Sequence, residues 1–244
     1  MKIWNQNAKN MNSAIDHFLS SEDIVLDQEL FLYDIEASIA HAHELQSINI
    51  LNGTETKKII SCLKKLARLF QANEFKLTSK YEDCHSAIED YLTKELGSLG
   101  QKIHTGRSRN DQVMVAMRLY ARVKLDQIQS INLKIAQSFL SKADKHALDP
   151  MPGYTHLQRA MPSTWGLWFG AFAESFLDNA DLLLNVQSWM NINPLGTAAG
   201  YGVNLPLTRD ISTKELNFKR KQLNSLYVQN SRGKFELELI GSLK

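Results

Sequence analysis

The segment RNDQVMVAMRLYARVKLDQIQSINLKIAQSFLSKADKHALDP, residues 109–150, contains neither Gly nor Pro between Asp111 and Asp149. Its core positions recur three and four residues apart, the spacing of one helical face: Val113, Met117, Tyr120, Lys124, Ile128, Ile131, Ile135 and Phe139. A helix of nearly forty residues would be about 55 Å long. Such a helix needs packing partners along its whole length, so the segment predicts a long helical bundle or a helical oligomer core.

The loop in front of this helix, KIHTGRSRNDQV (residues 102–113), is dense in hydrogen-bond donors. Gly106 allows a tight turn, and Ser108, Arg109 and Asn110 stand where the start of a helix offers free N–H groups and a positive dipole end. Arginine adds a planar fork that matches a carboxylate. The loop therefore predicts an anion site. The alternative is a polar capping loop, with Asn110 or Asp111 as N-cap and the arginines in surface ion pairs.

Helical periodicity extends over nearly the whole chain, which has only 12 Gly and 5 Pro in 244 residues. Residues 26–51 are amphipathic, and a further run of about residues 164–191 follows the long helix. The sequence predicts an all-α fold with two domains. Residues 1–110 form a small N-terminal helical domain, and residues 111–244 form the first part of a central bundle of long helices.

Composition limits the possible functions. Basic residues number 28 and acidic residues 26, for a net charge of +2, which argues against nucleic-acid binding. No apolar run approaches the ~20 residues of a membrane span. Cys62 and Cys84 have neither a metal-ligand spacing nor a disulfide framework, so we expect reduced cysteines in a soluble, cytoplasmic protein without a metal site.

Two further segments carry polar clusters. YEDCHSAIEDYLTKELG (residues 81–97) begins a helix, for which Asp83 is a good N-cap. MPGYTHLQRAMPSTWG (residues 151–166) predicts a rigid loop that carries Thr155, His156 and Gln158. A single loop histidine is more often structural than catalytic, and that reading stays open from the residues alone.

The string TGRSRNDQV resembles the signature of argininosuccinate lyases, within the fumarase/aspartase superfamily. PGYTHLQRAMP and EDCHSAIE are similar to two other motifs of that family, as is the loop NPLGTAAGYG (residues 193–202). The resemblance implies cleavage of argininosuccinate into arginine and fumarate by a homotetramer, without cofactor or metal. It implies catalytic roles for His156 and Thr155. The substrate-binding residues that it implies are Ser21, Asp83, His85, Ser108, Arg109, Asn110, Thr155 and Gln158.

The resemblance also has gaps. Family members are roughly twice as long and carry a later loop with the serine taken as the catalytic base, and no such string occurs here. We therefore expect the 244-residue chain to be inactive alone. Ser21 is assigned only by its spacing from Phe18. Two alternatives remain: a related lyase of the adenylosuccinate or aspartate type, and a non-catalytic structural protein on the lyase fold.

Overall fold

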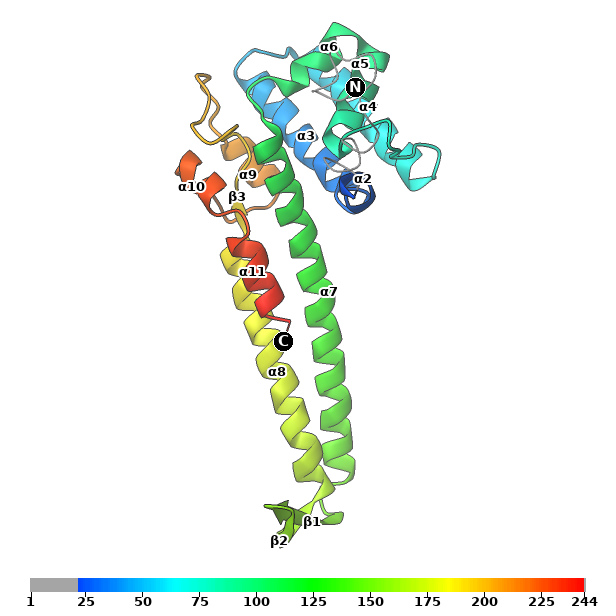
Figure 1. Cartoon of the computed structure of the whole chain (residues 1–244), viewed down its shortest axis with the longest axis vertical. Coiled ribbons are helices and arrows are strands. Elements are labelled where there is room, and N and C mark those ends of the chain that lie inside the picture. Colours follow the sequence, from blue (N-terminus) through cyan, green and yellow to red (C-terminus); the bar gives the residue numbers. More distant parts are fainter. Residues whose placement is uncertain (1–21, 244) are drawn as a thin grey trace. The chain divides into compact units, whose positions relative to one another are not determined.

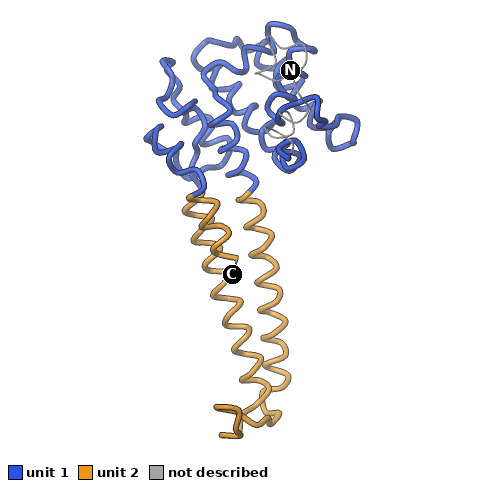
Figure 2. The backbone as a smooth tube through the Cα atoms, viewed as in Figure 1, with its two compact units in different colours: residues 1–120, 191–233 blue, residues 121–190, 234–244 orange. Residues whose placement is uncertain are grey.

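The computed structural model describes residues 22–243, and Figure 1 shows the order of the elements. Helices dominate, so the predicted all-α class is confirmed. The chain divides into two compact units, drawn in different colours in Figure 2. The first comprises residues 1–120 and 191–233, and the second residues 121–190 and 234–244. These units differ from the expected domains in that residues 111–120 and 191–233 group with the N-terminal residues. The domains 1–110 and 111–244 stay a prediction.

The first unit is built on three helices. They are α3 (Phe31–Ser47), α4 (Gly53–Gln71) and α5 (Cys84–Leu96), preceded by the short α2 (Asp23–Leu26). Their apolar faces meet in a core where the side chains of Phe31, Leu45, Leu63 and Leu92 are fully buried. Burial of such a side chain stabilises the fold by roughly 1.5–3 kcal/mol. This core fixes the start of α5, where site residues lie.

Capping residues set where these helices begin. Asn52 caps α4, because its side chain accepts from the N–H groups of Thr54 and Glu55 while the Glu55 carboxylate accepts from Asn52 N. Asp83 caps α5 through Ser86 N at 2.7 Å. The capping role expected of Asp83 is therefore confirmed.

Residues 191–233 complete the first unit. They contain β3 (Ile192–Asn193), α9 (Asp210–Glu215), β4 (Arg220–Lys221) and α10 (Ser225–Asn230), and β3 pairs in parallel with β4. Leu195 and Leu216 pack with Val115 and Leu119 from the start of α7 (Arg109–Lys145) in a second buried cluster. Two short elements, α6 (Ser98–Gln101) and the 3-10 helix η2 (Lys102–His104), lead from α5 toward α7.

The second unit consists of the remainder of α7, a hairpin, α8 (Trp165–Met190) and α11 (Lys234–Gly241). Phe139 of α7 stacks on Phe172 and Phe176 of α8, and Gln187 donates to the carbonyl of Arg122 at 3.2 Å. Many apolar side chains of α8 are exposed: Leu167, Trp168, Phe172, Leu177, Leu182, Leu184 and Trp189.

Several boundaries differ from those expected. The long helix spans 37 residues, Arg109–Lys145, instead of residues 111–149. The stretch expected to be one helix from residue 26 to residue 51 is interrupted between α2 and α3. The expected rigid loop after Pro150 is an antiparallel hairpin of β1 (Pro150–Thr155) and β2 (Gln158–Thr164).

Candidate functional site

The loop that precedes α7, residues 105–108, is held by interactions at the first turn of the helix. Ser108 stands immediately before the helix, and its N–H donates to Asp111 Oδ1 at 2.9 Å. The Ser108 hydroxyl accepts from both nitrogens of Asn110, at 3.3 Å from the backbone and 3.2 Å from the side chain. Reciprocal bonds of this kind are typical of a capping box. Because α7 begins at Arg109, Ser108 occupies the N-cap position that was predicted for Asn110 or Asp111, and those two assignments are wrong.

Asp111 connects the loop to a distant segment. Its side chain is fully buried, and Oδ2 accepts from Gly196 N at 3.0 Å and from Ala198 N at 2.8 Å. Burial raises the pKa of Asp111, and the hydrogen bonds from Ser108, Ala198 and Gly196 oppose that rise. The loop of residues 105–108 (the arginine loop) and the loop of residues 193–202 (the glycine-rich loop) therefore both donate hydrogen bonds to the Asp111 carboxylate.

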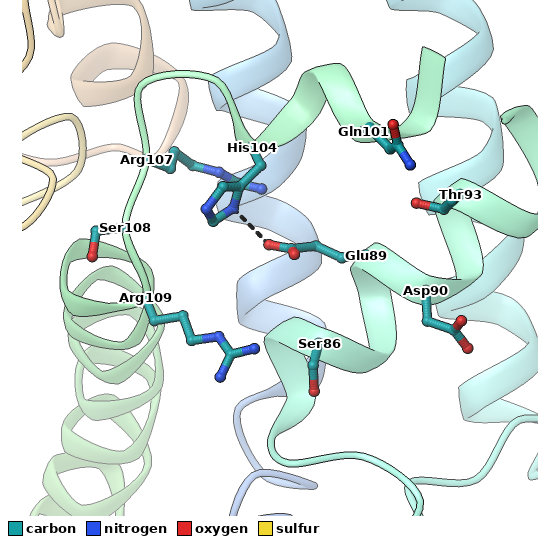
Figure 3. Close-up of a pocket in the computed structure, with 9 residues that line it drawn as sticks. All are labelled: Ser86, Glu89, Asp90, Thr93, Gln101, His104, Arg107, Ser108 and Arg109. Carbon is teal, nitrogen blue, oxygen red and sulfur yellow. Dashed lines mark ion pairs between the residues drawn. The ribbon is translucent and has the colours of Figure 1, made fainter. Parts of the chain in front are cut away.

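Arg109 extends from the start of α7 to the start of α5. Its guanidinium lies 2.8 Å from Glu82 Oε2 and 3.0 Å from Asp83 Oδ2. Figure 3 shows the Arg109 side chain directed toward Ser86, whereas the Ser108 hydroxyl points away from it. The ion pairs expected in the alternative reading of the loop are therefore present at Arg109. This guanidinium is held by two carboxylates.

A cavity of about 610 Å³ lies between α5 and the arginine loop. Arg107 lines it with a side chain that is 7% exposed and donates to Ser38 Oγ at 2.8 Å. On the same side, His104 pairs with Glu89 at 2.7 Å, as the dashed line in Figure 3 marks. Burial opposes ionisation of Glu89, yet the His104 hydrogen bond and nearby cations hold its pKa below the usual value. The cavity wall is completed by Ser86, Asp90, Thr93, Gln101, Ser108 and Arg109.

His85, expected to contact substrate, is buried in the first turn of α5. Its Nδ1 lies 2.8 Å from Oδ2 of Asp34 on α3, and the two side chains are 3% and 0% exposed. Cys84 Sγ lies 3.8 Å from the same ring nitrogen. Within residues 22–243, Asp34, Cys84 and His85 form the group of potential metal ligands whose atoms lie within 4.8 Å of one another. The expected absence of a metal stays a prediction.

The turn of residues 155–158, here called the histidine loop, belongs to the second unit. Thr155 pairs with Gln158, so His156 and Leu157 form a two-residue turn, with φ values of 49° and 63°. Positive φ at both central residues is the requirement of a type I′ hairpin turn. His156, Thr155 and Gln158 are all exposed. The turn therefore presents the imidazole to solvent at the tip of the hairpin.

The predicted site residues thus fall into several groups. The structure brings Arg109 to Asp83, and Ser108 to Asn110, all in the first unit. Asn110 Oδ1 also accepts from Arg232 at 3.0 Å. Thr155, His156 and Gln158 lie together in the second unit, and Ser21 lies outside the described residues.

Sequence reasoning missed the residues that support these groups. Asp34 and Arg232 lie 51 and 122 residues from their partners, and Glu89 lies on a different element from its partner His104. Arg107 lies in the quoted loop, residues 102–113, but was not predicted to line a cavity. Asp34 lies in the stretch predicted to be amphipathic, residues 26–51, but its burial became visible only in the structure. A buried carboxylate needs a partner, which here is His85.

None of the helices within residues 22–243 is long and apolar enough to cross a membrane.

The sequence profile of the lyase family matches residues 9–236. Argininosuccinate lyase of Xanthomonas oryzae pv. oryzae (strain PXO99A) is 47% identical over 241 residues, which cover 99% of this chain and 56% of that protein. Argininosuccinate lyase of Xylella fastidiosa (strain Temecula1 / ATCC 700964) is 48% identical over 241 residues, which cover 99% of this chain and 54% of that protein. The chain thus spans about half the length of these relatives.

Among solved structures, an EDDS lyase variant with bound fumarate superposes with a TM-score of 0.80 at 26% identity, covering 96% of this chain and 46% of that chain. The similarity extends over almost the whole chain, and the residues that match the family profile, 9–236, span all the motifs quoted above. The resemblance drawn from those motifs is confirmed, and the chain belongs to the lyase family.

Proposed function

We propose that this chain, within a protein of the full length of its relatives, cleaves argininosuccinate into arginine and fumarate. One observation carries the proposal: a Ser-Arg-Asn donor cluster stands at the first turn of a 37-residue helix, in a chain 47% identical to an argininosuccinate lyase over 241 residues. A helix start with such donors stabilises negative charge. The substrate class is a small dicarboxylate.

The reaction is a β-elimination. A base removes the proton from the carbon next to a carboxylate, the C–N bond breaks as the C=C bond forms, and an acid protonates the leaving nitrogen. Negative charge develops on the carboxylate, which requires preorganised donors. We assign the proton-transfer role to His156, because an imidazole side chain can both accept and donate a proton. Thr155 is the neighbouring hydroxyl. The proposed substrate-binding residues are Ser21, Asp83, His85, Ser108, Arg109, Asn110, Thr155 and Gln158.

The proposed assembly is a cytoplasmic homotetramer. The exposed apolar side chains along α8, such as Leu167, Trp168 and Leu177, support self-association, since a soluble monomer rarely leaves a large apolar patch exposed. In this assembly the arginine loop of one subunit faces the histidine loop of another. No cofactor or metal takes part in the proposed reaction.

A second candidate is a related lyase that releases fumarate from a different amine. The specific observation behind it is the structural similarity to an EDDS lyase variant whose structure holds fumarate. Such an enzyme would use the same carboxylate-binding residues and differ where the amine binds. The substrate preference therefore has to be measured.

The test uses the 244-residue chain joined to the part of the Xanthomonas oryzae relative that it does not cover, hereafter the joined protein. Fumarate release is followed by absorbance with argininosuccinate, adenylosuccinate and aspartate as separate substrates. The proposal expects turnover of argininosuccinate at least about a hundredfold above the other two, the discrimination that a differently shaped amine pocket provides. Preference for another substrate favours the second candidate, and a folded joined protein without turnover refutes both. The chain alone is the control and should show negligible turnover.

A further inference from the structure

Arg232 lies just after α10 and contacts Asn110 at the start of α7. Its Nη1 donates to Asn110 Oδ1 at 3.0 Å, across 122 residues of sequence. Both residues belong to the first unit. The Arg232 side chain is exposed, so this single hydrogen bond adds little to the stability of the fold. Its effect is on the orientation of the amide that it contacts.

Buried contacts hold the backbone that carries Arg232. Ser231, the preceding residue, is fully buried, and its hydroxyl accepts from Gln222 Nε2 at 3.1 Å. Gln229 Nε2 donates to Ala198 O at 3.4 Å and so connects α10 to the glycine-rich loop. The glycine-rich loop is in turn bound to the first turn of α7. The segment that carries Arg232 is therefore fixed relative to the start of that helix.

The guanidinium determines which way the Asn110 amide faces. Arginine has only hydrogen-bond donors, so the atom opposite it must be the amide oxygen. The amide nitrogen then lies on the other side, where Nδ2 donates to Ser108 Oγ at 3.2 Å. The reverse orientation would place two donors, the guanidinium and Nδ2, against each other.

The amide orientation in turn sets the direction of the Ser108 hydroxyl proton. A hydroxyl has two acceptor lone pairs and one donor. Ser108 Oγ accepts from Asn110 N at 3.3 Å and from Asn110 Nδ2 at 3.2 Å, so both lone pairs are in use. Within residues 22–243, the Ser108 O–H and the second Nδ2–H of Asn110 have no acceptor. Two neighbouring donors therefore remain free.

We propose that Arg232 is a positioning residue, which orients the Asn110 amide so that the Ser108 O–H and the free Nδ2–H meet one carboxylate of the substrate. That the acceptor is a substrate carboxylate rests on the proposed function. A carboxylate only accepts hydrogen bonds, through two oxygens, and so matches a pair of adjacent donors. Without Arg232 the amide can turn over, so that Ser108 donates to Asn110 Oδ1 and its O–H is lost to the substrate.

A direct contact between Arg232 and the substrate is the competing explanation, since the guanidinium has further donors. The two explanations differ in their dependence on Asn110. A positioning residue has no effect once the Asn110 amide is removed, whereas a direct contact acts with or without that amide. A double-mutant cycle of the two residues therefore separates the explanations.

The amide orientation is tested without ligand in the 244-residue chain, by ¹H–¹⁵N NMR of the Asn110 side-chain amide. The proton donated to Ser108 should exchange with solvent more slowly than the other proton on the same nitrogen. Arg232→Met should remove this difference, and Arg232→Lys, which keeps a donor, should retain it. A folded Arg232→Met chain with an unchanged difference would overturn the proposal, independently of any activity.

The cycle is measured in the joined protein as the Kd of succinate, an unreactive dicarboxylate, by calorimetry. Asn110→Ala should weaken binding at least about tenfold, as for loss of a hydrogen bond to a charged group, and Arg232→Met at least about fivefold. The double variant should bind within about twofold of Asn110→Ala alone. Arg232→Lys should restore most of the binding. Arg220→Met removes the same charge from an exposed position in the same unit and, as the matched control, should have almost no effect.

The outcomes separate the positioning role from the proposed function. Losses that add in the double variant would show that Arg232 acts without Asn110, and the positioning role would be wrong. An unchanged Kd in Arg232→Met would contradict it as well. If the two residues are coupled in succinate binding but the joined protein does not cleave argininosuccinate, the proposed function fails and the positioning role remains. If argininosuccinate is cleaved with the same kcat/KM by Arg232→Met, the positioning role alone fails.

Discussion

The carboxylate of Asp111 accepts a hydrogen bond from the backbone N–H of Ala198 at 2.8 Å, across 87 residues of sequence. The same Oδ2 atom accepts from Gly196 N at 3.0 Å, and Oδ1 accepts from Ser108 N at 2.9 Å. A fully buried carboxylate therefore fixes the start of α7 and the glycine-rich loop together. The donors of the arginine loop are oriented by this contact before any ligand arrives.

Asp111→Asn should destabilise the first unit. An amide has one oxygen, so either orientation leaves a buried N–H facing the amide nitrogen. We expect the free energy of unfolding to fall by about 2–3 kcal/mol, the cost of leaving such a group unsatisfied. Urea denaturation measures it, with Asp144→Asn on the exposed surface of the same helix as control. Equal stability of the two variants would show that the Asp111 contacts contribute nothing.

Gly106→Ala should also destabilise the arginine loop. Gly106 has a φ of 72°, and an added Cβ would lie 3.1 Å from Leu205 Cδ1 and 3.2 Å from Leu207 Cδ1. The left-handed conformation alone costs about 1–2 kcal/mol for a residue with a side chain. Thermal unfolding should show a lower midpoint. Gly170→Ala is the matched control, since a Cβ there meets no atom within 4 Å and the helix should gain up to about 1 kcal/mol. A stable Gly106→Ala chain would contradict the strain argument.

The elements with regular periodicity could be predicted from the sequence. The three-and-four spacing from Val113 to Phe139 predicted α7, and the aromatic run after Thr164 predicted α8. The hairpin could not be predicted in this way. Prolines at 150, 152 and 162 disfavour strands, and the turn residues His156 and Leu157 are unlike the Asn-Gly pair that usually indicates a type I′ turn.

Because of His41, the free energy of unfolding should decrease as pH falls. The ring is fully buried and its Nε2–H donates to Thr105 O at 2.9 Å. Burial, with the charge of Arg107, lowers its pKa to about 3. Below pH 6.5 the unfolded chain binds a proton that the folded chain excludes, so the free energy of unfolding should fall by about 1.4 kcal/mol per pH unit toward pH 4. His41→Gln should remove this slope in denaturation series. His43→Gln, at an exposed ion pair with Glu215, should keep it. Identical slopes in the two variants would contradict the assignment.

The polar residues of the candidate site could be predicted from the sequence, but their hydrogen-bond partners could not. Asp83, Ser108, Arg109 and Asn110 could be named because each lies within a short motif. The partner of His85 could not be named, because Asp34 precedes it by 51 residues and only tertiary packing brings α3 to α5. The same reason applies to Arg232, which reaches Asn110 from 122 residues away.

His156→Asn should separate chemistry from folding. Asn adopts positive φ more readily than most residues, so the type I′ turn should keep its shape while the imidazole is lost. In the joined protein we expect kcat to fall by about two to four orders of magnitude with argininosuccinate. Leu157→Asn, at the neighbouring turn position, is the control and should retain kcat within a few-fold. Near-normal kcat in the His156 variant would remove this residue from the chemistry.

The central claim is that the donors at the start of α7 hold the substrate dicarboxylate. The most direct measurement is kcat/KM for argininosuccinate in the joined protein carrying Arg109→Lys, compared with Arg122→Lys farther along the same helix. Lysine keeps the charge but loses the planar fork, so the account predicts a loss of at least about tenfold for Arg109→Lys and almost none for Arg122→Lys. Equal kcat/KM values for the two variants would contradict it.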